Sequence, residues 1–367
     1  MRPDYKSVDF DRGPFLVFYE LTRACDLASA HYRPCAQPAR HPQELSPESS
    51  RTIVDQLLGF DKPPLLVLTG GDPLKRDDVF DLTAYATSRG LRVAMTPSAT
   101  PLVTRDALAK LRDAGLSRLA LSLDGVDART HDAFRRVQGS YRRTLEILAE
   151  ARELDLALQV NTTVTQRNVG QIDAMADLLA TQGIALWSVF FLIPVGRGMA
   201  EQRLSAEQCE QVFETLWRHA RRQPYAIKTT EAHHYRRFVL QHLGDPRREP
   251  DGTAGDQVQR APLGVNDGRG VMFISHTGQI FPSGFMPVEC GRAPADSVVD
   301  VYRHAPLFQA LRRSDDLKGK CGACEYRRIC GGSRARAYAV SGDPLAAEPD
   351  CVYQPPRWRA EAALGAR

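Results

Sequence analysis

The sequence predicts an α/β protein: a partial (β/α)6 TIM-like barrel followed by a small cysteine-rich C-terminal domain. Six short apolar runs alternate with longer amphipathic stretches over the first 220 residues, which is typical of parallel strands buried on both faces. Six units are fewer than the eight that close a full barrel, so an open partial barrel or a doubly wound sheet fits them. Five of the eight cysteines lie in the last quarter of the chain, which indicates a second region with a separate role.

The individual elements follow from the period of the apolar residues along the chain. A serine followed by a proline at 46 and 47 is a helix-start signal. Strands are expected over 15–21, 65–69, 91–96, 118–123, 157–164 and 186–193. Helices are expected over 47–58, 77–88, 105–114, 141–154, 169–181 and 206–219.

Changes in composition divide the chain into three parts. The barrel is expected over 12–222, a bridging region and linker over 223–267, and the cysteine-rich domain over 268–355. Glycine, proline, aspartate and arginine crowd the end of the bridging region, and a hairpin pattern opens the last part. The sequence after Cys321 has little regular periodicity, so we expect its thiols to hold it together.

Composition excludes several classes of protein. Hydrophobic residues make up 43% and charged residues 25%, and a net charge of +4 is too small to favour nucleic acid as a partner. No apolar run approaches the roughly 20 residues of a membrane-spanning helix, and the first residues lack the apolar stretch of a secretory signal. We therefore expect a cytoplasmic protein whose clustered cysteines hold metal and do not form disulfides.

Four cysteines near the C-terminus have the spacing of metal ligands. Cys321 and Cys324 form a C-x2-C turn, Cys330 follows after five residues, and Cys351 lies further on. A C-x2-C turn directs both sulfur atoms the same way, so four such thiolates can meet at one metal centre. The spacing alone leaves an iron–sulfur cluster and a structural zinc site as alternatives.

Glycines and small polar residues follow several predicted strands, where the carboxyl ends of a parallel sheet meet. Alone, each motif is only a turn, but together they describe a ligand cleft at these strand ends. Glycines allow close approach of the backbone to a ligand, and a carboxylate accepts hydrogen bonds from an ammonium group. The candidate cleft residues are Gly70, Gly71 and Asp72 after the second strand, Ser122 and Asp124 at the fourth, and Asn161 in the fifth.

The loop after the first strand reads E-L-T-R-A-C-D-L-A-S-A-H-Y over residues 20–32. With G-G-D-P after the second strand, S-L-D-G after the fourth and the C-x2-C-x5-C-G-G tail, the chain from 15 to about 355 resembles the radical SAM superfamily. The resemblance is to members with a SPASM-type or twitch-type C-terminal extension. Among these, it is to the subgroup related to haem-synthesis and peptide-modifying enzymes.

This resemblance implies cofactors and a substrate class. It implies a [4Fe–4S] cluster on Cys321, Cys324, Cys330 and Cys351 in preference to zinc. It places S-adenosylmethionine (SAM) across the strand ends, with its ammonium group at Gly70, Gly71 and Asp72 and with Ser122 and Asp124 nearby. The implied substrate is a small molecule or a peptide, either a porphyrin-like precursor or a ribosomal peptide, with a partner protein or electron donor.

One departure from the family pattern bears directly on activity. The three family cysteines that hold the SAM-binding cluster align with Cys25, Ser29 and Tyr32, so two thiolates are missing. A serine hydroxyl is a poor ligand and a tyrosine is long and bulky, so we do not expect that cluster or the 5′-deoxyadenosyl radical it would generate. The alternative ligand set for a different metal is Cys25, His31 and Cys35.

Two other classes of function compete with a radical enzyme. One is a catalytically inactive relative that binds a peptide, an active paralogue or a metal; the other is an enzyme that uses the cleft for non-radical or different-metal chemistry. Ser283 stands where full SPASM members place a cysteine, which predicts one auxiliary cluster and not two. We interpret Cys209 as a buried apolar side chain, Cys290 as a peripheral thiol, and the pair His233–His234 as surface or cleft polarity.

Overall fold

The computed structural model describes residues 9–26, 37–200, 202–243 and 264–365, and its centre is one continuous sheet. Strands β1 to β7 run parallel in chain order, so each strand pairs with the next. The strands are β1 (Leu16–Glu20), β2 (Leu65–Thr69), β3 (Val93–Met95), β4 (Arg118–Ser122), β5 (Leu158–Val164), β6 (Leu186–Phe191) and β7 (Ala226–Thr230). The sheet is open, which confirms the predicted partial TIM-like barrel.

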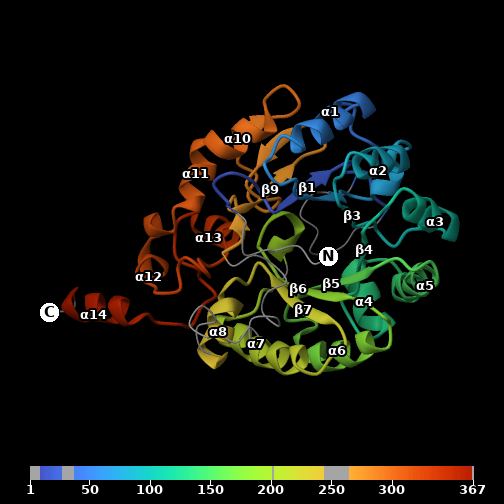
Figure 1. The fold of residues 1–367 in the computed structure, drawn as a ribbon. Helices are drawn as coiled ribbons and strands as arrows, with labels where there is room; N and C mark the ends of the chain where they lie inside the picture. The colour runs from blue at the N-terminus through green and yellow to red at the C-terminus, as the bar shows by residue number, and fades with distance from the viewer. Residues whose placement is uncertain (1–8, 27–36, 201, 244–263, 366–367) are drawn as a thin grey trace.

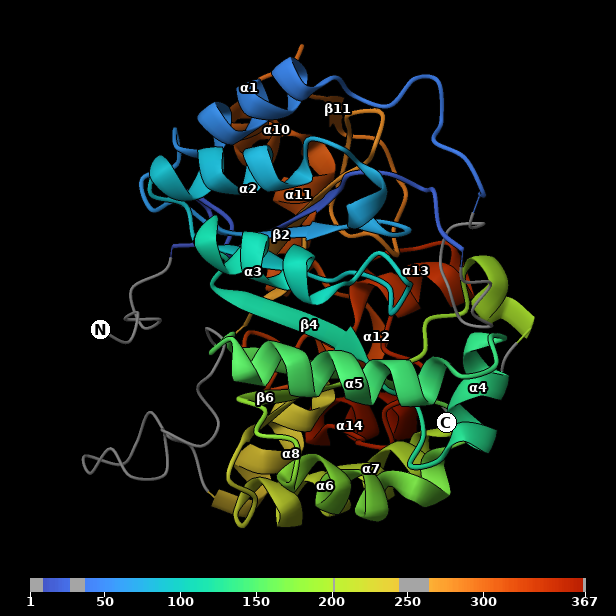
Figure 2. The ribbon, with the colours of Figure 1, turned by 90° about the vertical axis from the view of Figure 1, so that its right-hand side faces the viewer.

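Helices cover the outer side of this curved sheet (Figures 1 and 2). Apolar side chains of the helices and strands form one hydrophobic core between the two layers. The helices are α1 (Pro47–Leu57), α2 (Val79–Ser88), α3 (Arg105–Asp113), α4 (Ala128–Arg135), α5 (Ser140–Glu153), α6 (Ile172–Ala180), α7 (Ala206–Ala220) and α8 (His234–Leu243). Three short 3-10 turns accompany them at Pro73–Lys75, Val169–Gln171 and Gly196–Ala200.

All six predicted strands and all six predicted helices are present, within a few residues of the expected ends. The sequence did not predict β7, α4 or α8. Strand β7 contains Lys228 and is only partly buried toward its end, so it lacks the continuous apolar run that marked the other strands. Helix α4 is short and rich in polar residues, and it begins at the N-cap Asp127, whose side chain accepts from the Thr130 backbone N–H.

The C-terminal part extends the same sheet on its other edge. Strand β9 (Gly270–Ile274) pairs in parallel with β1, and β10 (Gln279–Phe281) returns antiparallel beside it, which confirms the predicted hairpin. The short strands β8 (Asn266–Asp267) and β11 (Gly291–Arg292) flank this pair.

Short helices complete the C-terminal part: α10 (Val298–His304), α11 (Pro306–Arg312), a 3-10 turn at Ser314–Asp316, α12 (Gly319–Gly322), α13 (Arg334–Ser341) and α14 (Pro356–Gly365). The sequence did not predict α13 because two of its buried residues, Arg334 and Arg336, are charged. A helix that buries arginines shows no apolar period.

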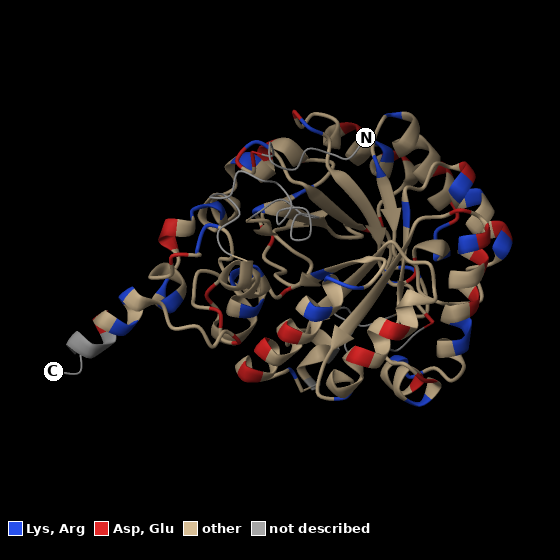
Figure 3. Cartoon of the chain, turned by 60° about the horizontal axis from the view of Figure 1, so that its bottom comes forward, with Lys and Arg blue, Asp and Glu red and all other residues tan. Residues whose placement is uncertain are grey.

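Basic and acidic residues are interspersed along the outer helices (Figure 3), in keeping with the small net charge. In the part of the chain that the structure describes, no helix has the length and apolar character needed to cross a membrane.

Candidate functional site

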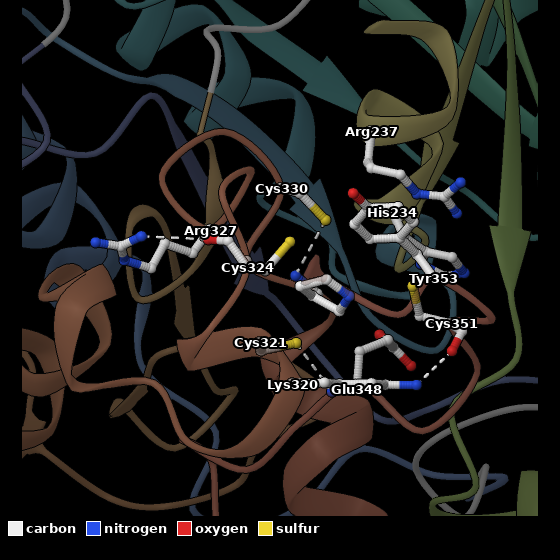
Figure 4. Close-up of a pocket in the computed structure, with 13 residues that line it drawn as sticks. His234, Arg237, Lys320, Cys321, Cys324, Arg327, Cys330, Glu348, Cys351 and Tyr353 are labelled. Atoms are coloured by element: carbon white, nitrogen blue, oxygen red, sulfur yellow. Dashed lines mark hydrogen bonds between the residues drawn. The ribbon is translucent and has the colours of Figure 1, made fainter. Parts of the chain in front are cut away.

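The four C-terminal cysteines line one pocket. Cys321 lies on α12, Cys324 and Cys330 lie in the loop that follows, and Cys351 lies beyond α13. Figure 4 shows the four sulfur atoms turned toward the middle of the pocket. The fold therefore brings together the four residues that the spacing singled out.

Backbone and side-chain donors point at two of these sulfur atoms. The Glu348 backbone N–H donates to Cys321 Sγ at 3.2 Å, and the Gly332 backbone N–H donates to Cys330 Sγ at 3.4 Å. The Arg334 guanidinium lies 3.9 Å from Cys321 Sγ. Donors to sulfur stabilise thiolates and tune the reduction potential of an iron–sulfur cluster.

Gly332 is required for this arrangement. Its φ is +65°, and a Cβ at this position would lie 2.6 Å from the Glu348 Cβ. Only glycine adopts such a conformation without strain and also leaves room for the neighbouring segment. The second glycine of the C-G-G motif thus lets the chain turn back and aim its N–H at Cys330.

The thiols are held in a protected environment. Burial raises the pKa of Cys324 to about 12 and also raises the pKa values of Cys330 and Cys351. Without a metal these side chains are neutral thiols, whereas coordination would deprotonate them. Among the described residues, no three His, Cys, Asp or Glu side chains converge on a single-ion position; the four cysteines surround a cavity instead.

His234, the first residue of α8, lines the same pocket and is fully buried. Burial lowers its pKa to about 3, so the ring is neutral and carries one N–H. The ring packs edge-on against Phe213 with 4.8 Å between centroids, yet neither ring nitrogen has a hydrogen-bond partner within the described chain. Of the two alternatives for this residue, surface polarity is wrong and cleft polarity fits, because His234 is buried and lines a pocket. The position of α8 beside the tail cannot be read from sequence spacing.

Cations and a tyrosine also lie at this pocket, and the sequence did not point to them. Lys320 donates to the Cys351 carbonyl, and Arg237 forms an ion pair with Glu210 on α7. Tyr353 lies at the pocket as well. Positive side chains near four thiolates offset the negative charge that a thiolate cluster would bring.

At the strand ends, Gly70 and Gly71 press the turn after β2 against the loop after β1. A Cβ at Gly70, whose φ is +149°, would lie 2.4 Å from the Thr22 carbonyl oxygen, and one at Gly71 would lie 2.3 Å from that of Ala24. The Gly71 N–H donates to the Thr22 carbonyl at 2.8 Å. The two glycines therefore fix the loop that carries Cys25.

Asp72 lies beside these glycines and is fully buried. Its carboxylate accepts from the Thr100 hydroxyl at 2.6 Å and from the Leu74 backbone N–H at 3.2 Å. Burial raises the pKa of this carboxyl group. In this structure both carboxylate oxygens have partners within the protein, so Asp72 supports the turn.

Of the other strand-end residues, two are partly accessible and one is buried. Ser122 and Asn161 lie opposite each other on β4 and β5, and both are partly accessible. Asp124 is buried, forms an ion pair with Arg135 of α4 at 2.5 Å, and accepts from the Thr163 backbone N–H at 2.8 Å. Asp124 thus anchors α4 to the sheet, a role that the sequence did not indicate.

Cys25 lies in the loop after β1 and is buried, with its Sγ 3.4 Å from the Ser98 hydroxyl. Ser98 in turn donates to the Gly71 carbonyl at 2.8 Å. The other residues of the cluster loop and of the alternative ligand set, Ser29, His31, Tyr32 and Cys35, lie outside the described residues. The donor chemistry of the aligned positions, one thiol, one alkyl hydroxyl and one phenol, does not fit a three-thiolate cluster.

The two remaining cysteines lie elsewhere. Cys209 is 2% exposed on α7, which confirms its interpretation as a buried side chain. Cys290 is a half-buried free thiol near the start of β11.

Comparison with known sequences places the whole chain among related enzymes. Residues 20–179 match the model of the radical SAM superfamily. An AdoMet-dependent heme synthase of Nitratidesulfovibrio vulgaris is 36% identical over 346 residues, which span 93% of each chain. An enzyme of the same name from Methanosarcina barkeri is 37% identical over 94% of this chain and 97% of its own.

Solved structures agree on the fold. The structure of Streptococcus suis SuiB bound to S-adenosylmethionine matches 93% of this chain and 78% of its own, with a TM-score of 0.68 and 18% identity. The structure of anSMEcpe with bound AdoMet matches 92% of this chain and 94% of its own, with a TM-score of 0.70 and 11% identity. This chain belongs to the radical SAM superfamily.

Proposed function

We propose that this protein binds a porphyrin-like tetrapyrrole in its barrel and holds one [4Fe–4S] cluster on its four tail cysteines, without conventional radical initiation. The observation that carries the substrate class is the identity of 36–37%, over more than nine tenths of both chains, with two AdoMet-dependent heme synthases. More distant relatives include an Fe-coproporphyrin III synthase and a pre-heme d1 synthase, at 27% and 26% identity. All of these names describe tetrapyrrole chemistry.

The tail pocket supports the cluster in three ways. Cys321, Cys324, Cys330 and Cys351 surround a cavity, whereas a single zinc would draw four sulfur atoms to about 2.3 Å from one ion. Two backbone N–H groups donate to sulfur atoms of the set. The buried His234 ring has an N–H at the same pocket with no partner among the described residues, and such a group costs about 1–3 kcal/mol unless a bound acceptor satisfies it. When bound, the cluster supplies one-electron transfer.

The loop after β1 supports the absence of conventional radical initiation. A cluster that leaves one iron open for SAM needs three protein ligands, and the aligned positions offer only Cys25. We therefore assign no step to such a cluster. Ser122 and Asn161 are partly accessible at the strand ends, so SAM remains a proposed ligand there. Binding of SAM at this place does not require that SAM is cleaved.

A peptide substrate is the second candidate. A mycofactocin maturase of Mycolicibacterium smegmatis is 30% identical over 94% of this chain. Its lower identity makes it the alternative outcome and not the main proposal.

The test has two readouts. Titration of the full-length protein with iron coproporphyrin III, followed by porphyrin absorbance, should show saturable binding at one site per chain. Incubation with SAM and a strong reductant should give little or no 5′-deoxyadenosine, while a Ser29→Cys/Tyr32→Cys double variant should gain iron. Failure to bind the porphyrin would overturn the substrate assignment, and robust 5′-deoxyadenosine production by the unaltered chain would overturn the assignment of the loop.

A further inference from the structure

A buried histidine and a buried glutamate meet at the carboxyl edge of the sheet, away from the tail pocket. Glu20 ends β1, and His276 lies in the turn after β9, the strand that runs in parallel beside β1 (Figure 1). His276 Nδ1 lies 2.9 Å from Glu20 Oε2, and the two residues are 3% and 0% exposed. The fold thus joins them at the edge where parallel sheets bind their ligands.

The contact with Glu20 determines which ring nitrogen of His276 carries a lone pair. Arg23 Nε lies 3.5 Å from the same carboxylate oxygen, and an ionised carboxylate accepts hydrogen bonds but does not donate them. The ring therefore donates from Nδ1, and the neutral ring has its lone pair on Nε2. This Nε2 has no hydrogen-bond partner among the described residues and, unlike the ring nitrogens of His234, it is not fully buried.

This arrangement is typical of a histidine that binds a metal. Such a histidine usually donates its second ring N–H to a carboxylate, which orients the ring and makes the binding nitrogen more basic. In the described part of the chain, no three His, Cys, Asp or Glu side chains converge on a position for a single ion. A porphyrin brings its own ring nitrogens to the iron, so one histidine is enough to hold it from one side.

Aromatic side chains lie on the same side of β1 as Glu20. The Tyr19 hydroxyl lies 2.8 Å from the hydroxyl of a serine on α1, so the side of β1 that carries Tyr19 faces the helices. Side chains alternate along a strand, so Phe18 and Glu20 are on the opposite, inner side. Phe18 is partly accessible and in register with Phe273, whose ring stacks on that of Phe281 with 6.0 Å between centroids. Aromatic rings suit the flat apolar faces of a porphyrin.

We infer that His276 is the axial ligand to the iron of a bound iron porphyrin, and that Glu20 positions its ring. The inference rests on the proposed function, which places a porphyrin-like tetrapyrrole in the barrel. It adds the group that selects a tetrapyrrole with iron over one without, because the Nε2 lone pair can bind iron and gains nothing from an empty porphyrin ring. Neither residue is assigned a chemical step.

The test compares iron coproporphyrin III with metal-free coproporphyrin III. The full-length protein should bind the iron complex more tightly, with the absorbance and electron paramagnetic resonance spectra of a histidine-bound iron. His276→Ala should lose these spectra and bind the iron complex at least about 10-fold more weakly, since even loss of the carboxylate partner costs about 10- to 100-fold at metal-binding histidines. Added imidazole should restore the spectra, and Glu20→Gln should give an intermediate affinity.

Two controls accompany these variants. Metal-free coproporphyrin III should bind equally to all of them, which also shows that they are folded. His304→Ala, which removes an exposed histidine in the last turn of α10, should bind the iron complex as the unaltered protein does.

The inference is overturned if His276→Ala keeps the spectra of a histidine-bound iron, or if it loses both porphyrins alike. It is also overturned if His41→Ala removes the spectra instead, because the His41 ring lies edge-on to His276 at 5.5 Å between centroids. Failure of the unaltered protein to bind either porphyrin overturns the proposed function as well. Binding of both porphyrins without a histidine on the iron overturns only this inference.

Discussion

His234 adds a hydrogen-bond donor to the tail pocket. It is a buried neutral ring with one N–H, set beside four cysteines by the start of α8 and held by Phe213. A bound cluster offers sulfur acceptors for that N–H. A donor to cluster sulfur stabilises the reduced, more negative state and so raises the reduction potential.

We therefore expect His234→Leu to lower the reduction potential of the tail cluster, by an amount on the order of tens of millivolts for one lost hydrogen bond. His234→Asn keeps a donor and should restore much of the potential. Redox titration followed by electron paramagnetic resonance measures both variants. Equal potentials in the unaltered protein and in His234→Leu, at equal iron content, would contradict the role of the ring.

The cysteines and His234 show what sequence can predict at the scale of single residues. A C-x2-C turn is local, so the convergence of Cys321 and Cys324 follows from their spacing alone. His234 reaches the pocket only because β7 leads into α8 beside the tail, a long-range contact that no local pattern encodes. Asp72 stays a predicted ligand contact; in this structure its carboxylate accepts from Thr100, which follows β3, and from Leu74 of its own turn.

At the scale of elements, the parallel strands were predictable because burial on both faces leaves continuous apolar runs. Strand β7 was not predicted because it carries Lys228, and α13 was not predicted because its buried residues include two arginines. In both elements charged side chains stand at positions where an apolar pattern would have marked the element. Elements that depart from the apolar pattern thus coincide with the barrel's inner face and with the joint between barrel and tail.

Helix α13 joins the tail to the barrel through Arg336. Its guanidinium forms an ion pair with Glu348 at 3.1 Å and one with Asp350 at 3.1 Å, and it donates to the Glu231 carbonyl at 2.7 Å. These acceptors lie after β7 and just before Cys351. The buried network therefore positions the fourth cysteine.

Arg336→Met would leave the buried Glu348 carboxylate without its cation and would leave Asp350 with Arg203 alone. We expect a loss of about 3–5 kcal/mol in the free energy of unfolding, the range for breaking a buried ion pair, together with loss of bound iron. Arg313→Met is the matched control, because it removes a cation from an exposed pair with Asp316 and should cost less than about 1 kcal/mol. Denaturant titration measures both, and similar small losses for the two variants would contradict the network's role.

At the scale of the whole molecule, one sheet runs from the barrel into the cysteine-rich part. Strands β1 to β7 form the barrel, and β9 extends the same sheet from β1 into the cysteine-rich part. The partial-barrel fold and the convergence of the tail cysteines were predictable because strand periodicity and cysteine spacing are both patterns of residues close together in the sequence. The joint between them was not, since it depends on Arg336 and on contacts across the sheet.

The central claim is one cluster per chain, on the tail cysteines, and none on the loop after β1. Iron and acid-labile sulfide, counted per chain after anaerobic reconstitution, test it most directly. We predict about four of each in the unaltered protein, close to none in Cys324→Ser, and up to about eight in Ser29→Cys/Tyr32→Cys, since each cluster contains four irons. About eight irons in the unaltered protein, undiminished iron in Cys324→Ser, or zinc in place of iron would contradict the account.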